Sequence, residues 1–171
     1  YEDIKRLEFS REQWSELFQR AREKSLKTVA VTADRGSLKM ASELGADSYF
    51  IYPACIDDFK LIIGEAQQQK PIFIQLGGIK INEAEEAIEE IKKQNNENII
   101  LVHGFQAFPT KLKDIKLNQL KLFKDRFNLP VALEDHTDAH TKLASIIPLL
   151  GATYGVHAII KHFTINRALK L

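Results

Sequence analysis

Short apolar runs alternate with amphipathic helical segments six times along this chain, and this alternation most constrains its fold. The runs are rich in β-branched and aromatic residues, which is typical of buried strands. They cover residues 28–32, 48–51, 71–75, 98–102, 129–132 and 156–160. Near-continuous apolar strands joined through helices indicate a parallel sheet covered by helices. The sequence therefore predicts an α/β fold, and both a doubly wound sheet and an eight-fold barrel fit this pattern.

The helical segments carry recognisable ends. Ser10 and Gln13 form a capping box before a helix over about residues 11–24. Gly45 stands just past the end of a helix over about residues 37–44, the usual place for a glycine. We expect four further helices. One begins at Asp57–Asp58, and another begins at Asn82, with Glu85 as its capping partner. The other two cover about residues 117–127 and 140–149.

Composition narrows the class of protein. The chain has 171 residues, a formal net charge of +1 and 44% hydrophobic residues, which is ordinary for a globular protein. The near-zero charge gives no electrostatic case for nucleic acid or a membrane surface, and no apolar run is long enough to span a bilayer. The single Cys55 fits a reducing compartment, so we expect a cytoplasmic protein. We expect one domain over residues 1–171, and a first residue of Tyr1 suggests a piece of a longer protein.

Polar residues at the predicted strand ends are the candidates for chemistry, because the carboxyl ends of parallel barrel strands converge on one mouth. They are Thr32, Asp34, Tyr52, Gln75, His103, Gln106, Glu134, Asp135, His136, His162 and Thr164. Two of them, His136 and His162, follow neighbouring strands and could share one divalent cation, since neutral imidazole binds Zn, Fe, Ni and Mn alike. The alternative is that each is a hydrogen-bonded histidine at a strand end.

Other candidates have simpler interpretations. His140 and His157 are poorly placed at the strand ends and are predicted to be structural or on the surface. Gly77–Gly78 could let a phosphate approach backbone amides, but a plain turn is favoured. Cys55 has no base beside it and is predicted to be an inert small residue.

The order of several motifs resembles the sialic acid synthase (N-acetylneuraminate synthase) family, from about Leu7 to Arg167. The segments that carry the resemblance are Leu44-Gly45 with the strand to Ile51, Lys70-Pro71-Ile72 followed by Gly77, Leu101-Val102-His103 with Phe108-Pro109, Asp135-His136-Thr137, Leu150-Gly151-Ala152-Thr153 and Lys161-His162-Phe163-Thr164. No single match is decisive, but their order and the two histidine motifs are specific.

The resemblance implies a (βα)8 TIM barrel of which this chain holds the third to eighth βα units, without the first two strands and a C-terminal antifreeze-like domain. It implies an enzyme that condenses phosphoenolpyruvate with an N-acyl-mannosamine or related open-chain aldose and releases phosphate. It implies a divalent metal, typically manganese, held by His136 and His162, which polarises the aldehyde as a Lewis acid. The expected partners are therefore the two substrates, phosphoenolpyruvate and the amino-sugar aldose, and the expected assembly is a homodimer.

The remaining candidate site residues lie at or near the predicted strand ends. We take Glu134 and Asp135 as the candidate catalytic groups beside the metal. The candidate substrate contacts come from five further residues, namely Thr32, Gln75, Gln106, Thr137 and Arg167.

Departures from the family pattern affect the donor site. Phe50 stands where the family has a lysine, and Gln75 and Glu134 stand where it has serines. Gln106 replaces an asparagine, and Ile160 replaces a glutamate. Each lost charge-assisted contact costs about 1.5–3 kcal/mol, so the changes disfavour a dianionic ligand.

Two hypotheses follow, and a third is weaker. The first is a divergent nonulosonic acid synthase that keeps the metal. The second is a non-catalytic or regulatory barrel that has lost phosphoenolpyruvate binding. The third is a metal-dependent aldolase or epimerase with Glu134 or Asp135 as general base.

Overall fold

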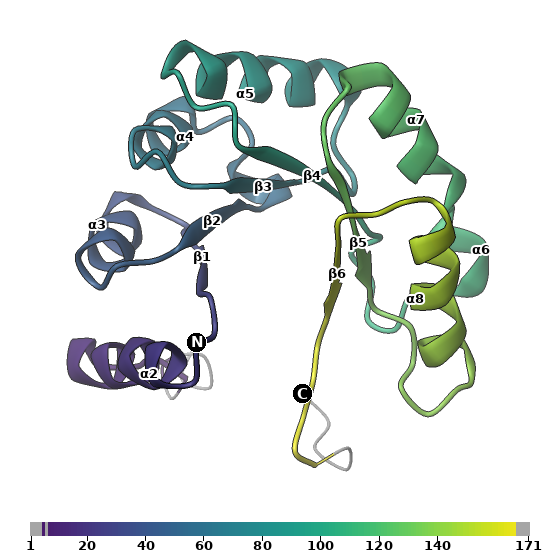
Figure 1. Ribbon diagram of the computed structural model, residues 1–171, viewed down its shortest axis with the longest axis horizontal. Coiled ribbons are helices and arrows are strands. Elements are labelled where there is room, and N and C mark those ends of the chain that lie inside the picture. Colours follow the sequence, from purple (N-terminus) through teal and green to yellow (C-terminus); the bar gives the residue numbers. More distant parts are fainter. Residues whose placement is uncertain (1–4, 6, 167–171) are drawn as a thin grey trace. The chain divides into compact units, whose positions relative to one another are not determined.

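The computed structural model describes residue 5 and residues 7–166, and its contacts divide the chain into two compact units. The first unit comprises Tyr1–Phe73 and Asn82–Asn98, and the second comprises Ile74–Ile81 and Ile99–Leu171. Strand and helix alternate through both (Figure 1). The elements are α2 (Arg11–Glu23), β1 (Val29–Val31), α3 (Arg35–Glu43), β2 (Ser48–Ile51), the 3-10 helix η1 (Pro53–Cys55), α4 (Phe59–Ala66), β3 (Ile72–Gln75), α5 (Ile81–Lys93), β4 (Ile99–His103), α6 (Leu112–Ile115), α7 (Asn118–Phe127), β5 (Val131–Asp135), α8 (Leu143–Thr153) and β6 (Ala158–Lys161).

The first unit forms around parallel strands in the order β1-β2-β3. Ala30 pairs with Tyr49 in a parallel register, and the Tyr49 amide donates to the carbonyl of Pro71 just before β3. The buried cluster of this unit takes side chains from strands and helices alike, and consists of Phe18, Leu38, Ala41, Ala46, Tyr49 and Leu61. Parallel strands that alternate with helices, and that pack against them, confirm the predicted α/β class in this unit.

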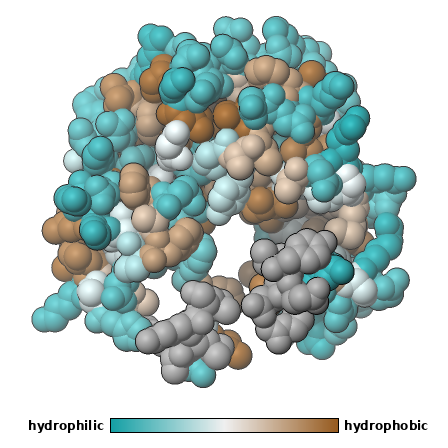
Figure 2. Space-filling view, turned by 180° about the vertical axis from the view of Figure 1, so that it is seen from behind, coloured by the Kyte–Doolittle hydropathy of each residue, from teal (hydrophilic) through white to brown (hydrophobic). Residues whose placement is uncertain are grey.

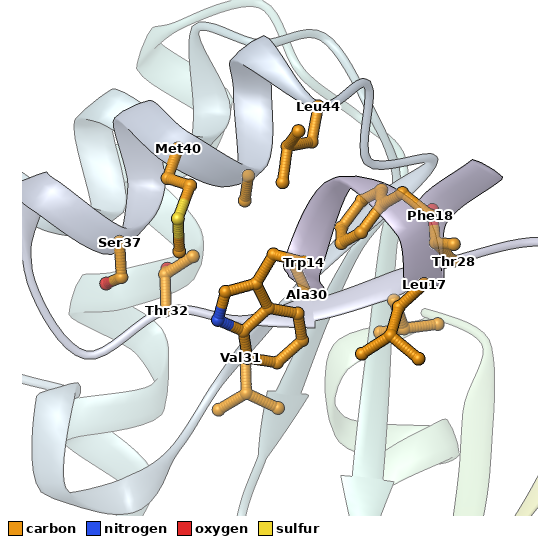
Figure 3. A pocket seen from close by; sticks show the side chains of 12 residues that line it. Trp14, Leu17, Phe18, Thr28, Ala30, Val31, Thr32, Ser37, Met40 and Leu44 are labelled. Atoms are coloured by element: carbon orange, nitrogen blue, oxygen red, sulfur yellow. The ribbon is translucent and has the colours of Figure 1, made fainter. Parts of the chain in front are cut away.

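An apolar hollow of about 480 Å³ lies between α2, β1 and α3 of the first unit (Figure 3). Trp14 and Phe18 reach into it from α2, while Met40 and Leu44 line it from α3. Its polar side-chain groups are the hydroxyls of Thr28, Thr32 and Ser37 and the indole N–H of Trp14, and no Asp, Glu, His, Cys, Lys or Arg is among its lining residues. The hollow therefore offers apolar contact and no chemistry.

The second unit forms around β3-β4-β5-β6, again in sequence order. Strand β5 pairs in parallel with β4 on one side and with β6 on the other. Helices α7 and α8 pack against β5 (Figure 1). All five residues of β5 are buried, and apolar Val131, Ala132 and Leu133 are at most 1% exposed. This buried, doubly paired strand positions the polar residues at its carboxyl end.

Several predicted element ends are confirmed. The capping box of Ser10 and Gln13 is formed, Asp58 caps α4 by accepting from the Leu61 amide, and Gly45 follows α3 with a φ of 78°. Three helix predictions were wrong. Helix α3 begins earlier because Asp34 caps it through Ser37, and α5 begins at Ile81, so Asn82 lies inside it. Helix α8 covers Leu143–Thr153 and not about residues 140–149. Strand β5 also extends through Asp135, past the predicted end at 132, because it pairs along its whole length.

The surface mixes polar and apolar residues, as the hydropathy-coloured view shows (Figure 2). Within the described ranges, no helix combines the length and the apolar character needed to cross a bilayer. Apolar exposure is notable on β1, where Val29 and Val31 are about half exposed. The prediction that residues 1–171 form a single barrel domain stays a prediction.

Candidate metal centre

The register between β5 and β6 brings two histidines together in the second unit. Asp135 is the direct partner of Lys161 across the two strands, so His136 and His162 each follow at the same level. Their ring centroids lie 4.9 Å apart and the rings cross at 78°. The predicted convergence of these two imidazoles is therefore present in the structure, although 25 residues separate them in the sequence.

A carboxylate completes this pair into a cluster. Glu134, His136 and His162 each offer one ligand atom, and these three atoms lie within 4.8 Å of one another. The distance from Glu134 Oε1 to His136 Nε2 is 3.4 Å. Among residues 5 and 7–166, this is the only set of three or more His, Cys, Asp or Glu side chains close enough to share a metal ion.

His136 is oriented by the loop after β4. Its Nδ1 donates to the carbonyl of Phe105 at 3.2 Å, because a carbonyl can only accept. In the neutral ring Nε2 is then left with the lone pair, and this atom is buried without a hydrogen-bond partner. A backbone carbonyl behind one ring nitrogen is the usual arrangement of a metal-binding histidine.

Two glutamine side chains hold Glu134 from the other side. Gln75, at the end of β3, and Gln106, after β4, both donate their amide nitrogen to Glu134 Oε2. Gln75 is itself fixed, because its carbonyl oxygen accepts from the Gly77 amide at 2.6 Å. Oε2 is thus saturated, while Oε1 faces the histidine pair.

The charges of Glu134 and His136 support each other. Burial alone would raise the pKa of Glu134, but the neighbouring His136 ring, together with the Gln106 and Gln75 amides, holds it below its ordinary value. Burial likewise opposes the charged form of His136, and the neighbouring Glu134 and the Phe105 carbonyl outweigh it, so the pKa of His136 is raised. The carboxylate is therefore ionised at neutral pH, as a metal ligand must be.

These residues fit a divalent metal ion. Two imidazoles and one carboxylate form a donor set that binds Fe, Mn, Co or Zn. Nε2 of His136 is buried without a hydrogen-bond partner, and a bound cation would offset the free-energy cost of burying it. The structure thus supports a metal centre at the two predicted histidines.

Glycines allow the strands to approach at the site. A Cβ on Gly104, directly after β4, would lie 2.6 Å from the carbonyl oxygen of Glu134 and 2.7 Å from its Cβ. A Cβ on Gly77 would lie 2.0 Å from the Gly104 carbonyl oxygen. Only hydrogen fits at either position. Gly77 therefore has a packing role beyond the plain turn that the sequence predicted.

Phe108 covers the histidine pair. Its ring centroid lies 4.2 Å from that of His136 and 5.2 Å from that of His162. The Phe108 side chain is nevertheless 60% exposed, so it forms the outer wall of the cluster. Sequence reasoning placed this residue in a loop and gave it no role in the site, and the signal it carried was its position shortly after a strand end.

Asp135 and Thr137 make contacts other than those that join the cluster. Asp135 pairs with Lys161 at 2.5 Å and accepts from the Thr137 amide. Thr137 is buried, and its hydroxyl makes no hydrogen bond. Thr32 belongs to the first unit, where its hydroxyl donates to Glu65. Arg167 lies outside the described residues, so the cluster joins five of the nine predicted residues, namely Gln75, Gln106, Glu134, His136 and His162.

The three other histidines have structural or surface positions. His103 is buried and donates from Nε2 to the carbonyl of Ile115 at 2.8 Å, and burial lowers its pKa. His140 is exposed beside Asp138, and His157 is exposed before β6. The prediction for His140 and His157 agrees with these positions.

The first unit holds a buried carboxylate that the sequence reasoning missed. Glu65 on α4 is 0% exposed; one of its oxygens accepts from Thr32, and the other is buried without a partner. Burial, with a smaller contribution from the charge of Asp58, raises its pKa to about 7 against the Thr32 hydrogen bond. In the same unit Phe50 is buried, and its ring contacts those of Phe73 and Tyr52.

Comparison with known proteins gives a consistent result. The sequence profile of the NeuB family matches residues 1–171. Pseudaminic acid synthase of Helicobacter pylori is 31% identical over 91% of this chain and 44% of its own length. The N,N'-diacetyllegionaminic acid synthase of Legionella pneumophila is 27% identical over 99% of this chain and 47% of its own. The chain thus spans about half the length of the curated relatives it matches.

Solved structures agree with the sequence relatives. The crystal structure of N-acetylneuraminic acid (sialic acid) synthetase from Leptospira borgpetersenii matches with a TM-score of 0.84 at 25% identity, covering 94% of this chain and 54% of the other. A phospho-2-dehydro-3-deoxyheptonate aldolase from Thermotoga maritima matches with a TM-score of 0.74 at 20% identity, over 88% of this chain and 46% of the other. The second likeness concerns the fold alone.

Proposed function

The chain belongs to the NeuB family, and from this premise we propose that the protein is a nonulosonic acid synthase. The proposed reaction condenses phosphoenolpyruvate with an N-acyl-mannosamine-type aldose in carbohydrate biosynthesis. C3 of the enol phosphate bonds to the aldehyde carbon, water adds at C2, and phosphate leaves, so a 2-keto sugar acid results. Relatives named pseudaminic and legionaminic acid synthases support a sugar acid product of this class.

The observation that carries the proposal is the histidine pair at the ends of β5 and β6. His136 and His162 face each other at 4.9 Å between ring centroids, and Nε2 of His136 has no other partner. A divalent ion bound there, which we propose to be manganese, would supply Lewis-acid polarisation of the aldehyde carbonyl. The register between β5 and β6 brings the two histidines side by side, so both can bind the same ion.

The neighbouring residues have proposed roles that follow from their contacts. Gln75 and Gln106 offer amide groups beside the cluster, and Thr137 offers a buried hydroxyl that makes no hydrogen bond in the protein. Glu134 supplies the carboxylate of the cluster, whereas the contacts of Asp135 with Lys161 and with the Thr137 amide support a positioning role.

The wider architecture is proposed on the same basis. We place the chain in a (βα)8 barrel as its third to eighth βα units, because parallel strands follow one another in sequence order within each unit. Thr32 and Arg167 would then contribute to substrate binding from other parts of that barrel. A cytoplasmic location is proposed from the one cysteine, Cys55, which is free.

An assay of phosphate release tests the proposed reaction. The full-length protein is incubated with Mn²⁺, phosphoenolpyruvate and each of a panel of N-acyl amino-hexoses, beginning with N-acetylmannosamine. Phosphate release that depends on the sugar, and that stops in His136→Ala but continues in His140→Ala, is the expected result. His140 is the matched control because it is an exposed histidine beside a carboxylate in the same unit. No release with any sugar by a metal-loaded protein would contradict the proposal and favour a non-catalytic barrel.

A further inference from the structure

We propose that Glu134 is a third protein ligand to the metal ion, through Oε1, and that Gln75 and Gln106 hold it in that position. This inference rests on the metal of the proposed function and extends it, because the family resemblance implied two histidines alone. It changes the assignment of Glu134 from a catalytic acid or base to a residue that binds the ion directly.

The geometry of the carboxylate favours this assignment. Oε1 of Glu134 lies 3.4 Å from Nε2 of His136 and belongs to the set of ligand atoms that also includes one nitrogen of His162. The Glu134 side chain is 4% exposed and that of His136 is 1% exposed. A contact of 3.4 Å between two potential ligand atoms is the spacing expected around one shared ion, since metal–ligand bonds are about 2 Å long.

The two glutamines decide which oxygen is available. Both donate to Oε2, so this oxygen is fully occupied, while Oε1 accepts no hydrogen bond from either amide. The amide of Gln75 cannot turn without losing the Gly77 hydrogen bond at its own oxygen. Hydrogen bonds of this kind to the outer oxygen of a ligating carboxylate are typical of metal sites.

The third ligand changes the chemistry of the site. A carboxylate lowers the net charge of the bound ion and its protein ligands by one unit relative to two neutral imidazoles. Two histidines and one carboxylate leave further coordination positions open for oxygen ligands of a substrate. The site therefore favours a neutral carbonyl or hydroxyl oxygen of a sugar over a second anionic group at the ion.

Metal titration of the full-length protein tests this inference without any activity measurement. Mn²⁺ is titrated by calorimetry and Co²⁺ by its visible spectrum, in the parent and in Glu134→Gln, Gln106→Leu, His136→Ala and His162→Ala. We expect one equivalent per chain in the parent and a loss of affinity of at least about tenfold in Glu134→Gln, with a smaller loss in Gln106→Leu. Asp138→Asn, at an exposed carboxylate beside His140, is the matched control and keeps the parent affinity.

The outcomes separate this inference from the proposed function. If Glu134→Gln binds both metals as tightly as the parent while the histidine variants do not, the histidine pair holds the ion and the third ligand is wrong. If all three ligand variants lose the metal and no sugar supports phosphate release, the site stands and the proposed reaction fails. Glu134→Asp provides a second test should Glu134→Gln not fold: withdrawing the oxygen by one methylene must shift the cobalt spectrum, and an unchanged spectrum contradicts the inference.

Discussion

The carboxylate of Asp135 and the ammonium group of Lys161 lie 2.5 Å apart, as direct partners on the neighbouring parallel strands β5 and β6. Asp135 is 1% exposed at its side chain and Lys161 is 34% exposed, and Lys161 also donates to the Ala144 carbonyl of α8. The pair joins the strands at the residues directly before His136 and His162. It therefore fixes the register on which the metal centre depends.

Replacing Lys161 with methionine should destabilise the protein and weaken metal binding together. The substitution leaves a buried carboxylate without its counter-charge, which costs about 2–4 kcal/mol of unfolding free energy. Urea denaturation measures this change, and Co²⁺ titration measures the effect on His162. The control is Lys121→Met, which breaks an exposed 2.6 Å pair with Asp125 on α7 and should cost less than about 1 kcal/mol. Equal losses in both variants would show that the buried pair has no special role.

Gly104→Ala should displace Glu134. The new Cβ would meet the Glu134 carbonyl oxygen at 2.6 Å, so β5 must move, at a cost of about 1–3 kcal/mol. We expect a lower urea midpoint and a lower Mn²⁺ affinity. Gly36→Ala in α3 is the comparison, since its Cβ would meet only the side-chain oxygen of Asp34, at 3.2 Å. Unchanged metal affinity in Gly104→Ala would mean that the close approach does not position Glu134.

Glu65→Gln should remove a pH dependence of stability in the first unit. The folded-state pKa of about 7 lies above the ordinary value of 4.5, so the folded state binds the proton more tightly. Stability is then greatest below about pH 4.5 and falls as the pH rises through 7, by up to about 3 kcal/mol at about 1.4 kcal/mol per pKa unit. In Glu65→Gln this decline should vanish, which makes the variant more stable than the parent at pH 8.

Urea denaturation at several pH values between 5 and 8 measures this effect. Glu86→Gln, at an exposed position of α5, is the control and should follow the parent. A parent stability that stays constant over this range, or a Glu65→Gln variant that declines like the parent, contradicts the prediction.

Phe108→Ala should expose the histidine pair with little effect on stability. Its ring packs against both histidines but is 60% exposed, so the free energy of unfolding should change by less than about 1 kcal/mol. Removing this apolar cover should speed the extraction of bound Co²⁺ by a chelator severalfold, because the apolar groups around a metal limit solvent access. Phe105→Ala is the matched control, since it keeps the backbone carbonyl that His136 uses. Equal extraction rates in the parent and Phe108→Ala would contradict this role.

Local signals were sufficient to predict most of the secondary structure. The predicted strand at 48–51 and the capping box at Ser10 coincide with β2 and with the start of α2. They are readable because hydrophobic period and capping depend on neighbours a few residues away. Where pairing between strands extends an element, as at Glu134 and Asp135 of β5, the same signals failed.

The site was predictable only in part. The motifs around His136 and His162 indicated a shared metal, and the structure brings these rings together. The roles of Glu134 and Asp135 could not be separated in the sequence, because they are adjacent residues of like charge. Successive side chains of a strand point to opposite faces, so one joins the histidines and the other joins Lys161.

The sequence by itself determined the alternation of strands and helices, the family and the two histidines. Tertiary structure alone decided which polar side chains meet. Gln75 and Glu134 are hydrogen-bonded although 59 residues apart, and the buried Glu65 finds Thr32 across 33 residues. The physical reason is that local preferences act over one or two turns of chain, whereas such contacts depend on strand register and on the packing of glycines such as Gly104, which a pattern of residue types does not record.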